Sequence, residues 1–350
     1  MKKYGVLVVD DSAFMRKAIG QVIEQHEELY VVGIARNGKD AIEKVKRLQP
    51  AVVTLDIEMP EMDGLEALEI IMNECPVPVV MLTNASADTA SASITSIELG
   101  AVDFIIKEKL FPQASIETLT VFWESLEVAI CSNVQRKKLQ TTHEELPIRS
   151  VKRKNKPLLS ENLDLLIIGC STGGPAALQS ILPYFENGLS FPIVVVQHMP
   201  KGFTRPLAER FDSICHLIVK EAEHEEVLVP GTIYIAPAGL QTTIKKDGHE
   251  AFFHLAEDAP IETLYHPSVD VTLLSASSIY KEKLLTVILT GMGQDGLIGC
   301  KQVRENQGKI IVESESTCVV YGMPRVVYEA GLADKQAPIT SIVSTIKSLI

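Results

Sequence analysis

The sequence predicts two α/β domains joined by a linker. Short apolar runs of the buried-strand type alternate with helical patterns over residues 1–130 and again over 161–350. Polar residues stand at the ends of these runs, as expected where parallel strands end at one edge of a sheet. Residues 131–160 are polar and without period, which is typical of a linker. The chain of 350 residues is long enough for two domains, each with its own core.

Composition narrows the class of protein. Hydrophobic residues make up 46% and charged residues 22%, which fits a globular chain. No apolar run is long enough to span a bilayer, and the N-terminus enters a strand directly, so we expect no membrane insertion, no signal peptide and a cytoplasmic protein. The net charge of −12 argues against nucleic acid as a partner. The six cysteines show no close pairs, which indicates free thiols.

The first half alternates strands and helices five times. The expected strands are 6–9, 30–35, 51–55, 78–82 and 103–106. Ser12 is the expected N-cap of the first helix, and Gly100 is the expected stop of the fourth. This order predicts a five-stranded parallel sheet covered on both faces.

Five polar residues end successive strands of this first half: Asp10, Asp11, Asp56, Thr83 and Lys107. Converging carboxylates repel one another unless a hard cation joins them, and oxygen ligands suit Mg²⁺. We therefore expect Asp11 and Asp56 to bind Mg²⁺, with Asp10 in support. Phosphoryl transfer onto Asp56 is the chemistry that this set favours, with Lys107 and Thr83 neutralising phosphoryl oxygens. One such Asp alone would more often be a helix cap.

The same residues carry a family resemblance. The motifs are Asp10-Asp11, Asp56-Ile57-Glu58-Met59-Pro60, Asp63-Gly64, Thr83 and Asp103-Phe104 before Lys107. Together they resemble the response-regulator receiver domain. The resemblance implies a flavodoxin-like fold, Asp56 as phosphoacceptor, Phe104 as the aromatic switch residue and a histidine kinase as phosphodonor. Glu108 departs from the Pro that the family usually has there.

The second half is organised around Gly169-Cys170-Ser171-Thr172-Gly173-Gly174, between a strand at 165–168 and a helix expected over 175–182. A serine on such a turn is exposed, and helix N–H groups point at charge that develops beside it. Further strands are expected at 192–196, 232–236, 285–290 and 309–312, with a helix over 205–211, so this domain is predicted to be doubly wound and mostly parallel.

Two later strand ends complete a candidate hydrolase site. His198 can take the proton of Ser171 as general base, and Asp295 can orient His198. The order Ser, His, Asp differs from that of the α/β-hydrolases. A lone His or a lone glycine-rich loop is more often structural. Gly173-Gly174 could instead cradle a phosphate, but no Lys follows them, so a P-loop is excluded.

Four motifs of this half look like the chemotaxis protein-glutamate methylesterase (CheB) family. They are Gly169 to Pro175, Gln197-His198-Met199-Pro200, Pro267-Ser268-Val269-Asp270 and Leu289 to Gly296. The resemblance implies Ser171 as nucleophile, His198 as base, Asp295 as orienting acid, and Thr172 and Met292 at the oxyanion site. It also implies a doubly wound esterase domain without a cofactor. His266 stands where the family commonly has Arg, and Gln241 where it often has His.

The family implies a function for the whole chain. Glutamyl methyl esters on methyl-accepting chemoreceptors are hydrolysed with release of methanol, certain glutamines are deamidated, and phosphorylation of Asp56 relieves inhibition by the receiver. We expect a monomer. Two other classes stay open on the residues alone: a receiver-linked signalling adaptor without catalysis, and a nucleotide-binding regulator that uses Gly173-Gly174.

Overall fold

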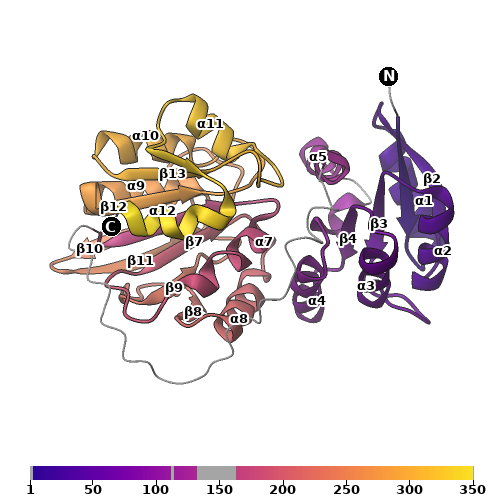
Figure 1. Ribbon diagram of the computed structural model, residues 1–350, viewed down its shortest axis with the longest axis horizontal. Helices are drawn as coiled ribbons and strands as arrows, with labels where there is room; N and C mark the ends of the chain where they lie inside the picture. Colours follow the sequence, from indigo (N-terminus) through magenta and orange to yellow (C-terminus); the bar gives the residue numbers. More distant parts are fainter. Residues whose placement is uncertain (1–2, 112–113, 132–162, 350) are drawn as a thin grey trace. The chain divides into compact units, whose positions relative to one another are not determined.

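The computed structural model describes residues 3–111, 114–131 and 163–349 (Figure 1). The chain divides into two compact units, 1–144 and 145–350, each of which is described by itself. The predicted linker, 131–160, lies outside the described residues apart from Cys131. No helix among the described residues is both long and apolar enough to cross a membrane.

The first unit is a five-stranded parallel sheet in the order β2-β1-β3-β4-β5. Its strands are β1 (Tyr4–Val9), β2 (Leu29–Ala35), β3 (Val52–Asp56), β4 (Val79–Thr83) and β5 (Asp103–Ile106). Its helices are α1 (Ala13–Glu24), α2 (Gly38–Leu48), α3 (Gly64–Glu74), α4 (Ala87–Glu98) and α5 (Ile116–Cys131), with a short 3-10 helix, η1 (Lys107–Leu110). The predicted flavodoxin-like receiver fold is confirmed.

Local sequence explains where these helices begin. Ser12 caps α1, because its hydroxyl accepts from the Met15 amide at 3.4 Å, as predicted. Asp63 caps α3 in the same way through the Glu66 amide. Gly64 follows because a Cβ there would collide with the carbonyl oxygen of Asp56. The Asp63-Gly64 pair therefore sets the path of the chain beside Asp56.

The second unit holds a seven-stranded sheet in the order β14-β13-β12-β6-β7-β9-β8, parallel throughout. Its strands are β6 (Leu165–Cys170), β7 (Ile193–Gln197), β8 (Ile218–Glu221), β9 (Thr232–Ile235), β12 (Leu284–Ile288), β13 (Lys309–Glu313) and β14 (Lys335–Ala337). A separate antiparallel hairpin consists of β10 (Gln241–Asp247) and β11 (Glu250–Ala256). The predicted doubly wound, mostly parallel domain is confirmed.

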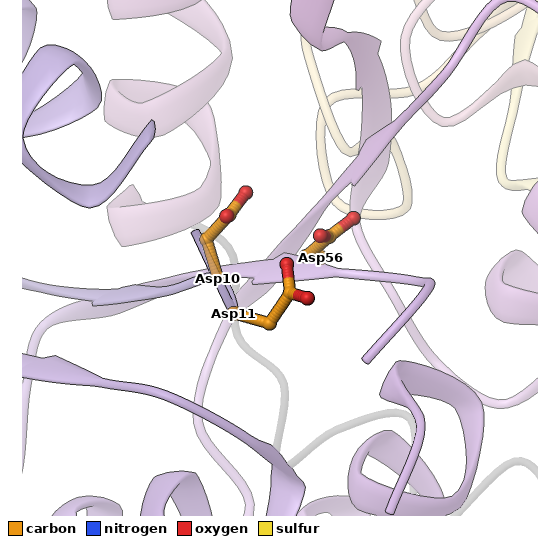
Figure 2. Close-up of side chains that lie close together, drawn as sticks. All are labelled: Asp10, Asp11 and Asp56. Atoms are coloured by element: carbon orange, nitrogen blue, oxygen red, sulfur yellow. The ribbon is translucent and has the colours of Figure 1, made fainter. Parts of the chain in front are cut away.

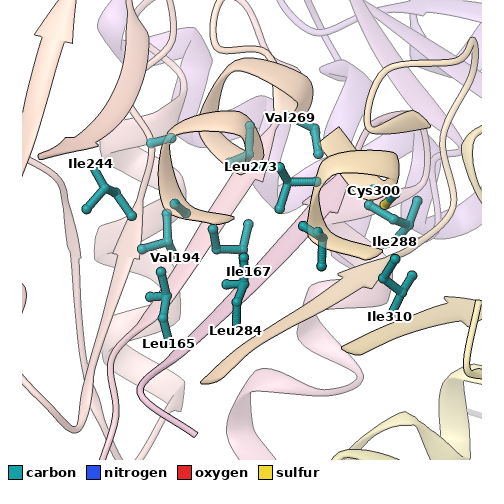
Figure 3. Packing of buried hydrophobic residues seen from close by; sticks show 14 of the residues in the cluster. Leu165, Ile167, Val194, Ile244, Val269, Leu273, Leu284, Ile288, Cys300 and Ile310 are labelled. Carbon is teal, nitrogen blue, oxygen red and sulfur yellow. The ribbon is translucent and has the colours of Figure 1, made fainter. Parts of the chain in front are cut away.

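Helices cover both faces of this sheet (Figure 1). They are α7 (Gly174–Gln179), α8 (Thr204–Ile214), α9 (Val269–Tyr280), α10 (Leu297–Glu305), α11 (Met323–Glu329) and α12 (Ile342–Leu349), with 3-10 turns η2 (Leu182–Tyr184), η3 (Lys281–Lys283) and η4 (Ile339–Ser341). On one face, Val269 and Leu273 of α9 and Cys300 of α10 pack against the strands, as Figure 3 shows. This packing anchors the start of α9, which bears on the site below.

One helix is shorter than expected. The pattern predicted a helix over 175–182, whereas α7 ends at Gln179 and a 3-10 turn follows. The Ser180 hydroxyl donates a hydrogen bond to the Ala176 carbonyl at 2.9 Å. Pro183 has no N–H to donate to the carbonyl of Gln179, four residues before it, so the α-helix does not continue through it.

Candidate functional site

Ser171, His198 and Asp295 all follow strands at the carboxyl edge of the seven-stranded sheet. Ser171 comes directly after β6, His198 directly after β7, and Asp295 lies in the loop that leads from β12 to α10. In the sheet, β6 has β7 on one side and β12 on the other, so the chain reverses its winding direction at β6. Ligand sites of open α/β sheets lie at such a switch point. The topology thus brings together three residues that are far apart in the sequence.

The serine turn is held by short backbone contacts. The Ser171 amide donates to the Thr290 carbonyl at 3.0 Å, and the Gly174 amide donates to the Ser171 carbonyl at 2.7 Å. Gly173 has a φ of +77°, which favours glycine. A Cβ on Gly291 would lie 2.9 Å from the Ser171 Cβ, so the loop after β12 approaches the serine closely. The Gly174 amide is already used, which argues against a phosphate cradle here.

His198 and Asp295 form the central pair of the site. The His198 Nε2 atom lies 2.7 Å from Asp295 Oδ2, and both side chains are buried, with 8% and 3% exposed. His198 Nδ1 is also buried and has no hydrogen-bond partner among the described residues. Because Nε2 donates to the carboxylate, Nδ1 is the nitrogen left to accept a proton. The Ser171 hydroxyl is not hydrogen-bonded to it in this state, as is common in enzymes without substrate.

Asp295 is a densely hydrogen-bonded carboxylate. Besides His198 it accepts from the Ser268 hydroxyl and from the amides of Val269, Asp270 and Gly296, at 2.7–3.1 Å. Burial works to raise the pKa of Asp295, but the hydrogen bond and charge of His198 and the amides of Val269 and Asp270 outweigh it, so the pKa lies below its ordinary value. The carboxylate sits at the first turn of α9, where helix N–H groups favour negative charge. Asp295 is therefore held in its charged form.

Two residues that touch this pair had no role assigned from the sequence, although Ser268 stands in one of the CheB-like motifs. The Tyr265 ring stacks on the His198 ring, with centroids 4.1 Å apart and planes 8° apart. Ser268 caps α9 and also donates to Asp295 Oδ1 at 2.8 Å. Ser268 had a signal, since a serine before an apolar helical run is a typical N-cap. Tyr265 had none, because its place on His198 depends on the path of a long loop.

A third residue without a role assigned from the sequence is Asp270, which lies in the first turn of α9 and donates its amide to Asp295. Its Oδ1 accepts from the Gly299 amide at 2.7 Å, which ties α9 to α10. Burial raises the pKa of Asp270 to about 6, and the neighbouring charge of Asp295 adds to the rise. Asp270 and Asp295 thus share one buried region: burial disfavours the charge of both carboxylates, and the pKa falls below its ordinary value only for Asp295, which accepts the hydrogen bond of His198.

The residues expected near the oxyanion lie beside the serine turn. Thr172 offers its carbonyl to the Thr290 hydroxyl at 3.0 Å, and Met292 is half-buried in the glycine loop after β12. Gln197 braces the same turn, because its side-chain amide donates to the carbonyls of Ser171 and His198 at 3.0 and 2.9 Å. The roles predicted for Thr172 and Met292 stay predictions.

The acidic pocket of the first unit gathers the expected strand-end residues. Carboxylate oxygens of Asp10, Asp11 and Asp56 lie within 4.8 Å of one another, and Figure 2 shows the three side chains together. The Lys107 Nζ atom lies 2.8 Å from Asp56 Oδ1 and 3.6 Å from Asp10 Oδ2. Asp10 and Asp56 are buried, whereas Asp11 is exposed. The sheet thus assembles one cation and three carboxylates at one edge.

Burial and pairing shift the pKa values of Asp56 and Lys107 in this pocket. Burial raises the pKa of Asp56 to about 6; Lys107 opposes that rise, and the charge of Asp10 adds to it. Burial disfavours the charge of Lys107, but pairing with Asp56 and Asp10 outweighs it and raises the pKa of Lys107. The buried Oδ2 atoms of Asp10 and Asp56 have no hydrogen-bond partner among the described residues. Such oxygens, with the exposed Asp11 beside them, fit the ligand set of Mg²⁺.

The other residues expected around this pocket are placed as follows. Thr83 ends β4 and is buried, and Phe104 is buried in β5. Glu108, which replaces the usual Pro, is exposed in η1, and its carboxylate accepts from the Ala85 amide at 3.4 Å. Asn84 in turn donates to Glu58 at 2.7 Å. Two acidic side chains therefore bind the loop that follows Thr83.

Comparisons with known proteins cover both units. The family model of the CheB methylesterase matches residues 166–346, and that of the response regulator receiver domain matches residues 6–116. A protein of Syntrophomonas wolfei named protein-glutamate methylesterase/protein-glutamine glutaminase 1 is 42% identical, and the alignment covers 100% of both chains. A protein of Thermotoga maritima named protein-glutamate methylesterase/protein-glutamine glutaminase is 41% identical, over 99% of this chain and 98% of the other.

Among solved structures, the second unit is similar to the crystal structure of the Thermotoga maritima CheB methylesterase catalytic domain. The two share 45% sequence identity with a TM-score of 0.52, and the alignment covers 54% of this chain and 99% of that one.

Proposed function

Because the chain belongs to the CheB methylesterase family and carries a response regulator receiver domain, we propose that it hydrolyses glutamyl methyl esters on chemoreceptors and releases methanol. One observation carries the proposal. His198 uses Nε2 for the buried Asp295, and its Nδ1 has no hydrogen-bond partner in the part of the chain that the structure describes; the residue follows β7 at the edge of the sheet where Ser171 lies. This arrangement suits a base that serves a serine nucleophile.

The reaction follows from these atoms. His198 Nδ1 accepts the Ser171 hydroxyl proton as Oγ attacks the ester carbonyl carbon. Asp295 stabilises the imidazolium that forms. The proton then passes to the departing methoxide, and methanol leaves an acyl-serine. Water attacks this acyl group, again with His198 as base, and the free glutamate is released. No step needs a cofactor.

The oxyanion of each tetrahedral intermediate needs donors beside Ser171. We assign this region to the turn at Thr172 and the loop at Met292, which flank the serine at the carboxyl edge of the sheet. A glutamine side chain follows the same route with ammonia as leaving group, which gives the deamidase activity that the names of the relatives include.

The first unit regulates the second in this proposal. A histidine kinase phosphorylates Asp56, and Asp11 and Asp56, with Asp10 in support, would hold Mg²⁺, which neutralises phosphoryl oxygens when bound. Lys107 and Thr83 interact with the same phosphoryl group, and Phe104 is the aromatic residue that changes position. Phosphorylation relieves inhibition of the esterase by shifting an equilibrium between two states.

We propose that the protein works in the cytoplasm as a monomer, with methyl-accepting chemoreceptors as substrate and a histidine kinase as phosphodonor. All six cysteines are free thiols, as in proteins of a reducing compartment. An adaptor without catalysis is not favoured, because the curated relatives are named as enzymes.

Methanol release from methylated receptor, with and without a small phosphodonor and Mg²⁺, tests both units. The unchanged chain should release methanol faster with the phosphodonor, and Ser171→Ala should release none under either condition. Ser180→Ala is the matched control, because Ser180 is exposed and its hydroxyl bonds only the Ala176 carbonyl. Near-normal release by Ser171→Ala would overturn the proposed nucleophile.

A further inference from the structure

Gln241 is a fully buried amide at the start of β10, in the antiparallel hairpin. Both ends of its side chain are used. Nε2 donates to the Tyr265 carbonyl at 2.7 Å, and Oε1 accepts from the Ser268 amide at 3.0 Å. One side chain therefore ties together both ends of the segment 265–268.

The two ends of that segment contact the two members of the His198–Asp295 pair. Tyr265 stacks on the His198 ring at 4.1 Å, and the Ser268 hydroxyl donates to Asp295 at 2.8 Å. Gln241 touches neither His198 nor Asp295 through these contacts; it binds the backbone of the two residues, Tyr265 and Ser268, whose side chains make them. Any displacement of Gln241 is therefore felt by the base and by its orienting acid together.

The His198 ring has few polar restraints among the described residues. Nε2 has the single carboxylate contact and Nδ1 has no partner among the described residues. One hydrogen bond allows the ring to turn about the Nε2–Oδ2 direction, which would move Nδ1 relative to Ser171. A parallel aromatic face prevents that turn, because it fixes the plane of the ring.

Tyr265 also reaches the glycine loop. A Cβ on Gly293, which has a φ of +82°, would lie 2.6 Å from the Tyr265 hydroxyl oxygen. The tyrosine thus fills the space between His198 and the loop that carries Met292. Its backbone carbonyl is the group that Gln241 holds.

We propose that Gln241 is a positioning residue of the esterase site. It holds Tyr265 flat against His198 and Ser268 against Asp295, so that Nδ1 stays directed at the serine turn. The inference rests on the proposed function for the use that is made of Nδ1. Misplacing a reacting group by about 1 Å can cost on the order of 100-fold in rate, so a side chain that touches no substrate can control turnover.

Two variants test the two hydrogen bonds of the Gln241 side chain. Gln241→Met keeps the length of the side chain and removes both hydrogen bonds. Gln241→Glu keeps an acceptor for the Ser268 amide and places a second oxygen against the Tyr265 carbonyl. Thr242→Val is the matched control, because Thr242 is the next residue of β10, is equally buried, and has a hydroxyl without a hydrogen-bond partner among the described residues.

The kinetic test is a split between kcat and KM for methanol release by the full chain. Gln241→Met should lower kcat on the order of 10- to 100-fold with KM within about twofold of the parent, because the base is misdirected while the substrate surface is intact. Gln241→Glu should show the same split, and Thr242→Val should match the parent. An unchanged kcat in both Gln241 variants would overturn the proposal.

A second readout does not depend on activity. The stacked Tyr265 ring shifts the NMR resonances of the His198 ring protons, which are identified by their loss in a His198→Gln sample. We expect this ring-current shift to shrink in both Gln241 variants and to persist in Thr242→Val. If it persists in folded Gln241→Met or Gln241→Glu protein, the positioning role is wrong. If the parent releases no methanol, the proposed function fails while this measurement still decides the role of Gln241.

Discussion

The Ser268 hydroxyl donates to Asp295 Oδ1 at 2.8 Å and at the same time accepts from the Val271 amide at 3.4 Å. One side chain therefore begins α9 and supports the acid of the candidate site. The position of Asp295 is tied to the position of this helix, which is packed into the core through Val269 and Leu273 (Figure 3). The site is thus anchored on a rigid element.

Ser268→Ala should lower both stability and turnover. Loss of the N-cap costs about 1 kcal/mol of unfolding free energy. Loss of a hydrogen bond to a charged carboxylate should lower kcat roughly tenfold. Thermal unfolding and methanol release measure the two effects. Ser268→Thr keeps the hydroxyl, so its kcat should stay closer to the parent than that of Ser268→Ala, while its extra methyl group at a fully buried position lowers stability. Equal losses of kcat in both variants would contradict this explanation.

Gly291→Ala should displace the nucleophile. The added Cβ would lie 2.9 Å from the Ser171 Cβ and collide with the Met323 sulfur, in a region of close packing. Overpacking of this kind costs about 1–3 kcal/mol, and the shift of Ser171 should reduce kcat on the order of 10- to 100-fold. Labelling of Ser171 by a serine-reactive phosphonate measures the loss without receptor.

Gly20→Ala is the control for the general effect of adding a methyl group. Gly20 lies in α1, where a new Cβ meets Val31 at an ordinary 3.5 Å. That variant should keep the parent labelling rate. If Gly291→Ala protein is labelled as fast as the parent, the added methyl group does not displace Ser171 and the prediction is wrong.

Asp270→Asn should change the pH dependence of stability. The pKa of Asp270 is about 6 in the folded chain against an ordinary 3.8, so the folded state favours the neutral form. The carboxyl therefore stabilises the protein below pH 3.8, and that contribution is lost as the pH rises towards about 6. The amide keeps its acceptor for Gly299 and never ionises.

The difference in unfolding free energy between Asp270→Asn and the parent should accordingly grow between pH 3.8 and about 6, in favour of the variant. Above that range it should level off on the order of 1–3 kcal/mol. Calorimetry of the full chain across this range measures it. A pH-independent gain for Asp270→Asn would contradict the assignment.

Removing Mg²⁺ should separate the two chemistries. A chelator should abolish phosphorylation of Asp56 by a small phosphodonor, because three carboxylates within 4.8 Å need a cation to admit an anion. Phosphonate labelling of Ser171 should stay unchanged, since the proposed ester hydrolysis uses no metal. Mass spectrometry reads both modifications. Asp11→Asn should weaken phosphorylation, whereas Asp63→Asn, which keeps the cap of α3, should not.

Much of the fold was predictable because its strands are buried on both faces. Runs such as those of β1, β3, β6 and β12 are mostly apolar and almost wholly buried, and they lead to polar residues. A parallel sheet then brings those ends to one edge, so the residues gathered at each site followed from the order of the strands alone.

The strands that escaped prediction are exposed or at the edge. β8 carries the exposed Ile218 and polar residues, and β10 ends in Lys245-Lys246-Asp247, so neither has a buried-strand pattern. The two-residue turn Gly248-His249 was the available signal for the hairpin. The contribution of the hairpin to the site could not be predicted from local sequence, because Gln241 binds residues that lie 24 and 27 positions later in the chain.

The choice of nitrogen on His198 was equally beyond the sequence. A histidine at a strand end offers both ring nitrogens, and only the placement of Asp295 by α9 decides that Nε2 is used and Nδ1 is left. The positions of candidate residues follow from topology, whereas their orientation depends on side chains of the loop 257–268.

Each unit holds, within itself, every side chain that its own chemistry needs. The three carboxylates and Lys107 come from the first unit, and Ser171, His198, Asp295 and their supports come from the second. In the proposed mechanism, phosphorylation therefore lends no atom to ester hydrolysis and acts on the access of a receptor side chain to Ser171. Regulation and catalysis are then separate properties of the two units. A different sensing domain could be placed before the same esterase without a change to its catalytic step.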